Sequence, residues 1–490
     1  MASETRRTHH QVTFAVLAAG VAAYALLQSL VTPVLPTIQE SLHTTQNTVT
    51  WVLTAYLLSA SIFTPIMGRI GDMIGKERVF VATMSALAVG SLLAALASNV
   101  QVMIIARVIQ GIGGGVLPLA FGIIRDEFPR EKLNGAVGAI ASLIAVGSGL
   151  GIVLAGPIVS ALDYHWLFWL PMIMTVIAAV AAHFLVPESP IRTPGRISWL
   201  PAVLLSGWLV ALLVALSQAP VWGWGSGKVA GLLIAAVVLA YAWVRVELRS
   251  AIPLIDMKMM RLPAVWTNNL VALLFGIGMY ATFAFLPEFV QTPKSTGYGF
   301  GSSITESGLI LLPMSVAMFI VGLGASRLAQ RIGGKTVVLV GSLISTVSLA
   351  LLAFAHGATW ELYIATGVMG VGFGLAFSAM SSLIVAAVPP EQTGVASGMN
   401  ANIRTIGGSI GAALMASVVT ASPAADGLPR ESGYTNGFAM LGGALLVAAF
   451  AAILIPVSRQ KTRLVEFADE PAHAEMAAVP GGTVVGDKPE

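Results

Sequence analysis

The chain has 490 residues, of which 56% are hydrophobic and only 10% are charged. Soluble domains use roughly 45–50% apolar residues, so this composition indicates a membrane protein. The 26 Lys and Arg residues nearly balance the 23 Asp and Glu residues, so the net charge of +3 gives no indication of nucleic-acid binding. Because the chain contains no cysteine, disulfides, thiolate metal sites and cysteine nucleophiles are excluded.

Apolar runs of about 20 residues predict membrane-spanning helices. We count fourteen such runs, near residues 13–36, 49–68, 79–98, 101–124, 135–160, 166–187, 199–217, 228–246, 264–290, 305–326, 336–355, 360–388, 398–420 and 437–457. The first run is too long for a signal-peptide core, so we expect it to remain as a helix. The predicted fold class is therefore an all-α membrane protein with fourteen spans.

The positive charges are distributed unevenly over this map. Most Lys and Arg residues fall on one side of the membrane, whereas Lys228, Lys294 and Arg430 fall on the other. Short cytoplasmic loops retain positive charge, and an even number of spans then places both chain ends in the cytoplasm of a cell-membrane protein. Residues 458–490 lack apolar periodicity and are expected to form a disordered tail.

Two segments of the sequence repeat at a nearly constant distance. Gly68-Arg-Ile-Gly-Asp-Met-Ile-Gly-Lys matches Ser326-Arg-Leu-Ala-Gln-Arg-Ile-Gly-Gly-Lys, which pairs Gly75 with Gly333. A second match pairs one set of three glycines with another: Gly111, Gly113 and Gly115 with Gly370, Gly372 and Gly374. Such repeats are typical of transporters built from two related halves.

The repeat divides the chain into five parts. A cytoplasmic segment (1–12) precedes a six-helix bundle (13–190), and a second six-helix bundle (263–457) precedes the tail (458–490). The remaining residues (191–262) are predicted to form two inserted helices with their flanking loops.

Three motifs resemble those of the major facilitator superfamily. Its loop signature, G-x-L-a-D-r-x-G-r-k, is matched between the second and third predicted helices by Gly68, Asp72, Gly75, Lys76 and Arg78. Arg107-Val-Ile-Gln-Gly-Ile-Gly resembles the second motif, and Gly151, Gly156 and Pro157 resemble the antiporter motif. With fourteen spans, the chain is most similar to the drug:proton antiporters of the QacA and EmrB type.

This resemblance implies a conformational latch at Asp72. In the family the corresponding acid holds the cytoplasmic side closed, and here Gly68, Gly75, Lys76, Arg78 and Arg69 would support it. Asp72 is expected near the N-terminus of the helix that starts near Gly398, where the helix dipole would stabilise its carboxylate by roughly 0.3–1 kcal/mol. Arg125 is a candidate second partner.

Two cations, Arg107 and Arg404, fall inside predicted spans. A charge at the centre of a bilayer costs at least about 2.5 kcal/mol, so such residues usually have a function. Arg107 matches the family motif that is linked to proton transfer. Arg404 could equally line a cavity or anchor helix packing.

Proton coupling requires an acid that can load and release a proton. Glu288 is the first candidate because Pro287 is expected to break the helix beside it, and Glu306 is the second. Either could also be an ordinary acid at the membrane interface.

Polar and aromatic side chains in apolar helices could line a substrate cavity, since an apolar cleft with few polar groups suits amphipathic organic molecules. The candidates are Gln28, Tyr56, Asn268, Asn269, Tyr280, Phe283, Asn400, Asn402 and Arg404.

The sequence and the resemblance together predict a proton-coupled antiporter that exports hydrophobic or cationic small molecules, as in multidrug efflux. A proton-coupled exporter or importer of one metabolite is the alternative. No phosphate-binding loop, metal motif or catalytic constellation is present, so neither an enzyme nor a cofactor is expected. The expected partners are a small-molecule substrate, protons and the lipid bilayer, with no nucleic acid, and the chain is expected to function as a monomer.

Overall fold

The computed structural model describes residues 10–189, 199–250, 253, 255–388, 393–421 and 428–456. The predicted tail (458–490) and most of the predicted N-terminal segment (1–12) lie outside these residues. Within them, all regular elements are helices, which confirms the predicted all-α class.

The first group of helices, here called the N-terminal bundle, runs from α1 to α8. Its elements are α1 (His10–Leu30), η1 (Thr32–Val34), α2 (Leu35–Ser41), α3 (Gln46–Ile74), α4 (Lys76–Ala95), α5 (Val100–Gly111), η2 (Ile112–Gly115), α6 (Val116–Glu127), α7 (Arg130–Ala161) and α8 (Trp166–Leu185). The first predicted span is interrupted at Pro33 and Pro36, because proline lacks the N–H that an α-helix interior requires.

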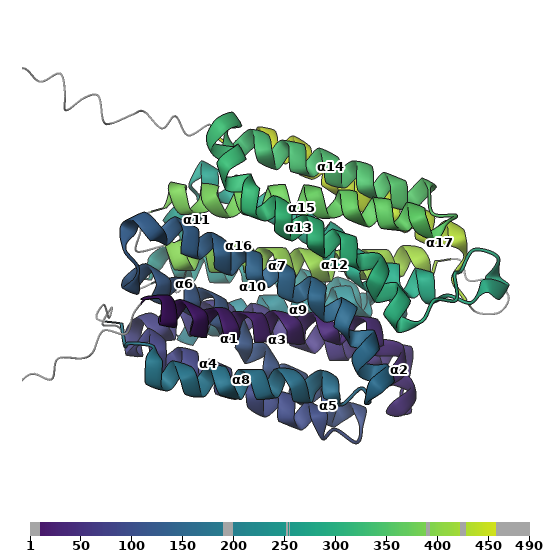
Figure 1. The fold of residues 1–490 in the computed structure, drawn as a ribbon, viewed down its shortest axis with the longest axis horizontal. Coiled ribbons are helices and arrows are strands. Elements are labelled where there is room, and N and C mark those ends of the chain that lie inside the picture. The colour runs from purple at the N-terminus through teal and green to yellow at the C-terminus, as the bar shows by residue number, and fades with distance from the viewer. Residues whose placement is uncertain are drawn as a thin grey trace, which may run out of the picture. The chain divides into compact units, whose positions relative to one another are not determined.

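The second group, here called the C-terminal bundle, contains α12 (Pro263–Gln291), η3 (Lys294–Thr296), α13 (Ile304–Ile332), α14 (Gly334–Phe354), α15 (Thr359–Ala387), α16 (Thr393–Val419) and α17 (Glu431–Ile453). Between the groups lie α9 (Trp199–Trp222), α10 (Gly227–Arg249) and α11 (Met257–Met260). Each bundle has its own apolar core, drawn from residues 16–186 and, apart from Ile152, from residues 271–455. Figure 1 shows the early and late helices as separate groups.

Twelve helical segments among the described residues are long and apolar enough to cross a membrane, compared with the fourteen predicted. The two missing from this set are α7 and α16. In α7 the apolar segment is assigned only among the described side chains, as Gly147–Ala161, whereas α16 carries Asn400, Asn402 and Arg404 within its length. These polar residues lower the mean hydropathy of α16 below that of its neighbours.

The repeated loop motif is shorter than predicted. Gly68 and Asp72 belong to the last turns of α3, and Gly75 alone links α3 to α4. Gly333 links α13 to α14 in the same way. Both glycines have positive φ, 128° and 87°, with ψ of 134° and 138°. L-residues rarely adopt this backbone conformation, so each link requires glycine.

The repeated glycines make equivalent contacts in the two bundles. A Cβ at Gly111 would meet Ser59 of α3, and one at Gly370 would meet the backbone of Met314 in α13. The next pair shows the same correspondence, because Gly113 lies against α4 and Gly372 against α14. The structure therefore supports the internal repeat at the level of packing.

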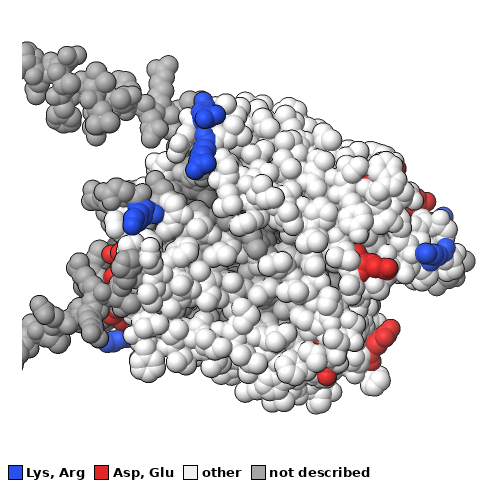
Figure 2. Space-filling model, in the orientation of Figure 1, with Lys and Arg blue, Asp and Glu red and all other residues white. Residues whose placement is uncertain are grey.

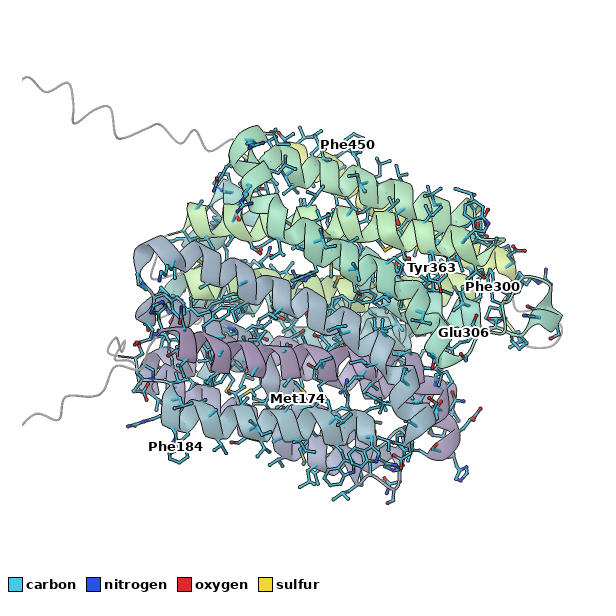
Figure 3. The ribbon with its side chains drawn as sticks, in the orientation of Figure 1. Met174, Phe184, Phe300, Glu306, Tyr363 and Phe450 are labelled. Atoms are coloured by element: carbon cyan, nitrogen blue, oxygen red, sulfur yellow. The ribbon has the colours of Figure 1, made fainter. Side chains whose placement is uncertain are left out.

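The surface of the bundles carries apolar side chains between two charged ends. Figure 2 shows Lys, Arg, Asp and Glu at both ends of the visible face and very few between them. Phe184 and Phe450, labelled in Figure 3, are 76% and 62% exposed. Such an apolar surface suits contact with lipid acyl chains rather than water.

The glycine link at Gly75 yields a stability prediction. We expect Gly75→Ala to lower the thermal unfolding temperature in detergent more than Gly333→Ala. Positive φ costs each variant about 1–3 kcal/mol, but at Gly75 a Cβ would also collide with the Glu188 carboxylate, whereas at Gly333 its nearest neighbour would be 3.9 Å away. The control is Gly443→Ala in α17, which has open space around it and should be neutral or slightly stabilising. Equal unfolding temperatures for all three variants would contradict the prediction.

Candidate functional site

The predicted latch residues gather around the link between α3 and α4, at what is here called the Gly75 end. Asp72 forms an ion pair with Lys76 at 3.4 Å, and its side chain is 24% exposed. The Lys76 ammonium also donates a 2.7 Å hydrogen bond to Asp126 at the end of α6. Since Lys76 and Asp126 are only 4% and 1% exposed, theirs is the buried ion pair of this end.

The Asp126 carboxylate accepts hydrogen bonds from three side chains. Besides Lys76, the guanidinium of Arg125 binds Oδ1 at 3.0 Å, and the Ser189 hydroxyl donates to Oδ2. Arg125, predicted as a partner of Asp72, is therefore paired with Asp126. The network joins the ends of α4 and α6 to the segment that follows α8.

Arg78 and Glu188 tie the end of α8 to the same link. Their side chains form an ion pair at 3.2 Å, and the Glu188 carboxylate lies directly against Gly75. A Cβ at position 75 would occupy the space that this carboxylate fills. Gly75 is thus required both for its backbone conformation and for the approach of Glu188.

The two bundles meet at this end through α16. Pro118 of α6 lies next to Gly68 of α3 and also next to Gly398 of α16. One turn further, the amide of Asn402 donates a 2.9 Å hydrogen bond to the carbonyl of Ser61 in α3. The expectation that a helix starts near Gly398 was wrong by about one turn, because α16 already begins at Thr393.

A second contact between the bundles uses the glycines of α7. Gly151 packs against Ser29 of α1 in its own bundle, whereas Gly156 lies against the backbone of Thr305 at the start of α13. The helix continues through Pro157 to Ala161. The predicted antiporter-motif helix therefore contacts both bundles, and small residues allow the close backbone approach.

Arg107 lies fully buried within the N-terminal bundle. Its Nε donates to the carbonyl of Val52 at 2.9 Å and its Nη1 to Oε1 of Gln110 at 2.8 Å. The guanidinium also lies 4.2 Å from the ring centroid of Tyr56. These contacts place Arg107 and Tyr56, which were predicted for different roles, in one polar group inside an apolar core.

The remaining central residues come from both bundles. Gln28 of α1 donates a 3.1 Å hydrogen bond to the hydroxyl of Tyr280 in α12, so this pair crosses between the bundles. Tyr280 also contacts Phe283 edge to face at 6.4 Å. The guanidinium of Arg404 lies over the ring of Phe377 at 4.8 Å.

The asparagines predicted for the cavity form a separate cluster between α12 and α16. The Asn400 amide donates to Oδ1 of Asn269 at 2.9 Å, and Asn268 donates to the carbonyl of Ala264 at 2.6 Å. All three side chains are at most 5% exposed. The hydrogen bond between Asn400 and Asn269 joins α16 to α12, whereas that of Asn268 stays within α12.

The two candidate proton carriers have different surroundings. Glu306 caps α13, since its carboxylate accepts from the backbone N–H of Ser303 at 2.8 Å. Figure 3 places Glu306 near Phe300, at one end of the molecule. Glu288 is exposed, lies near the end of α12 and accepts a 3.1 Å hydrogen bond from the buried hydroxyl of Tyr434.

Several residues of these groups were not anticipated from the sequence. Tyr24 could have been found, because it precedes Gln28 by one helical turn and so shares its face. Asp126, Glu188 and Phe377 carried no signal of this kind, since their partners are distant in the sequence.

The buried pair at the Gly75 end yields a second prediction. Asp126→Asn should lower the thermal unfolding temperature in detergent strongly, since leaving the buried Lys76 ammonium short of a counter-charge costs on the order of 3–5 kcal/mol. Asp72→Asn, at a partly exposed position, should cost about 1 kcal/mol or less. Equal unfolding temperatures for Asp126→Asn and Asp72→Asn would show that Asp126 is not the main counter-charge of Lys76.

The fold and these sites can be compared with known proteins. The family model described as Major Facilitator Superfamily matches residues 17–412 and 269–484. Among solved structures, the human organic anion transporter MFSD10 (TETRAN) has a TM-score of 0.65 at 17% identity, covering 90% of this chain and 99% of that chain. At this identity the likeness concerns the fold alone.

Curated relatives carry names that refer to drug resistance and export. The tetracenomycin C resistance and export protein of Streptomyces glaucescens is 29% identical over 431 residues, which cover 86% of this chain and 78% of that protein. Multidrug resistance protein 3 of Bacillus subtilis is 30% identical over 379 residues, covering 76% and 72%. A multidrug resistance protein B homolog of Mycobacterium tuberculosis is 29% identical over 387 residues, covering 77% and 70%. The chain therefore belongs to the Major Facilitator Superfamily of transporters.

Proposed function

We propose that this transporter is a proton-coupled antiporter that exports hydrophobic small molecules by alternating access. The observation that carries the proposal is that two bundles with separate cores meet mainly where α16 packs against α3 and α6 and where α13 packs against α7. Two bodies joined in this way can rock about a central site and expose it to one side at a time. The names of the relatives support export of toxic compounds as the physiological direction.

The proposal includes the finer topology predicted from the sequence. We add α7 and α16 to the twelve apolar helices, which brings the number of spans to fourteen, because each extends for 27 residues or more and packs within the helical bundles. Helices α9 and α10 are then the inserted pair of the QacA and EmrB type. The Gly75 end, with Arg69, Lys76, Arg78 and Arg125, would face the cytoplasm together with both chain ends.

The substrate would bind between the bundles, where Gln28 and Tyr280 meet. The sequence predicts hydrophobic or cationic cargo, and the apolar surroundings of these residues support the hydrophobic part of that prediction. The same fold could instead carry one specific metabolite in either direction.

Transport direction can be tested with everted membrane vesicles. If the chain is an exporter driven by protons, a hydrophobic dye should accumulate in vesicles that are acidified inside and should leave when the pH gradient is collapsed. Vesicles without the protein provide the control. Equal dye accumulation with and without the pH gradient would contradict proton coupling.

The latch proposal makes a separate prediction. Asp72 lies near the end of α3, a helix that also contacts α16, and we propose that its ion pair with Lys76 stabilises the state closed at the Gly75 end. Asp72→Asn should abolish transport in these vesicles while the protein remains folded, as judged by its elution in gel filtration. Full transport by a well-folded Asp72→Asn protein would remove Asp72 from the mechanism.

We propose Glu288 as the proton carrier in preference to Glu306, whose carboxylate already caps α13. Glu288→Gln should transport substrate without coupling to the pH gradient. When substrate is added to the detergent-solubilised variant, it should not cause the proton release that it causes in the wild type, as measured with a pH-sensitive dye in weak buffer. Tyr434→Phe, which removes only the hydrogen-bond donor, should retain proton release. Normal proton release from Glu288→Gln would assign coupling to another group.

A further inference from the structure

Two arginines lie within the helical bundles without an acidic partner. Among the residues that the structure describes, neither Arg107 nor Arg404 has a carboxylate oxygen within 4.0 Å. Each lies instead over an aromatic ring, at 4.2 Å for Arg107 and 4.8 Å for Arg404. Within the described part of the chain, no carboxylate therefore neutralises the positive charge of these two arginines.

The two arginines differ in how well the protein satisfies them. Arg107 has two side-chain hydrogen bonds and is fully buried in its own bundle. The Nε of Arg404 is buried and has no hydrogen-bond partner within the described chain. Arg107 also keeps one unpartnered donor, its Nη2, but among the described residues only Arg404 of the two has a guanidinium that makes no hydrogen bond.

Arg404 lies near a contact between the bundles. One helical turn after it, Gly408 lies against the ring of Tyr280, so this face of α16 points toward Tyr280 as well as Phe377. Tyr280 is the residue that accepts the hydrogen bond from Gln28 of the other bundle. Tyr24 precedes Gln28 by one helical turn and shares its face of α1.

These residues form what we call the Arg404 cluster: Tyr24, Gln28, Tyr280, Phe377 and Arg404. Aromatic rings provide an apolar surface for the body of a ligand, and a guanidinium in low dielectric strongly attracts an anion and repels a cation. The acid Glu288 lies eight residues beyond Tyr280, about 12 Å along the helix axis, and is hydrogen-bonded to Tyr434.

We propose that Arg404 binds the anionic group of an amphipathic aromatic substrate, so that the transporter prefers hydrophobic anions to hydrophobic cations of the same shape. This inference rests on the proposed export function and narrows its substrate class. It replaces the expectation of cationic cargo, which came from the family resemblance.

Tetraphenylborate and tetraphenylphosphonium are matched probes, because they share one shape and differ in the sign of their charge. Their affinities for the detergent-solubilised full chain can be followed through the fluorescence of its 10 Trp residues. We expect tighter binding of tetraphenylborate. Arg404→Gln should weaken that binding by about tenfold or more, because it removes the attraction between two opposite charges in a site of low dielectric, whereas Arg404→Lys keeps the positive charge and should retain most of the binding.

Arg245→Gln is the matched control. Arg245 also lies over an aromatic ring, that of Tyr241 at 5.8 Å, but on the exposed surface of α10. This variant should leave both affinities unchanged. A thermal unfolding scan of each variant distinguishes lost binding from lost folding, and Arg404→Lys provides a second test if Arg404→Gln is unstable.

Two results would overturn the inference: tetraphenylphosphonium binding more tightly than tetraphenylborate, or equal tetraphenylborate affinity in Arg404→Gln and wild type. Proteoliposomes with an imposed pH gradient separate this failure from failure of the proposed function. If tetraphenylborate is exported equally by wild type and Arg404→Gln, the export function stands and the role of Arg404 in binding the anion is wrong. If binding shows the expected dependence on charge but no ion is moved by the gradient, the Arg404 site stands and proton-driven export is wrong.

Discussion

The architecture depends on helices whose backbones approach closely enough to pack without large side chains between them. Within the C-terminal bundle, Gly276 of α12 lies against the backbone of Arg404 in α16, and Gly407 of α16 lies against that of Leu273. Between the bundles, Gly156 of α7 lies against Thr305. In lipid there is no hydrophobic driving force between helices, because acyl chains are as apolar as the side chains. Close van der Waals packing at small residues therefore stabilises the helix contacts. Glycine has no rotamers to reset, which suits surfaces that must separate and meet again.

Charge is handled differently at the end and in the middle of the molecule. At the Gly75 end, Lys76, Arg125 and Asp126 form a compensated network that connects α4 to α6. In the middle, Arg107 relies on a carbonyl, an amide and an aromatic ring, and Arg404 on an aromatic ring. A buried compensated network favours one arrangement of the helix ends, whereas an uncompensated charge leaves an interaction open for a ligand.

The sequence predicted the helical class, most of the spans and the repeat, because each follows from local patterns of apolar residues and glycine. It did not predict that the motif at Gly75 would be a single-residue link, since Gly68 and Asp72 read as loop residues but extend α3. The span count differed because the amides and the arginine in α16 lower its hydropathy while helping to pack it against α12 and α3.

Most of the candidate residues proved to be in contact with other polar or aromatic groups, but their partners could not be read from the sequence. Lys76 pairs with Asp126 and Gln28 with Tyr280, across separations of 50 and 252 residues. Such pairings depend on how helices cross in three dimensions. Local spacing does indicate which residues share a helix face, and on that basis Tyr24 belongs with Gln28.

The position of α9 affects how a molecule dissolved in the bilayer can reach the interior. Its apolar side chains pack with those of α3 and α16 in one shared core, which includes Leu205 and Leu209 of α9, Ile66 of α3 and Ile406 of α16. Trp224, just beyond α9, donates a hydrogen bond to Ser417 of α16. A molecule that approached sideways through the lipid at this pair of helices would meet α9 first, so lateral entry there requires α9 to move or the molecule to take another route.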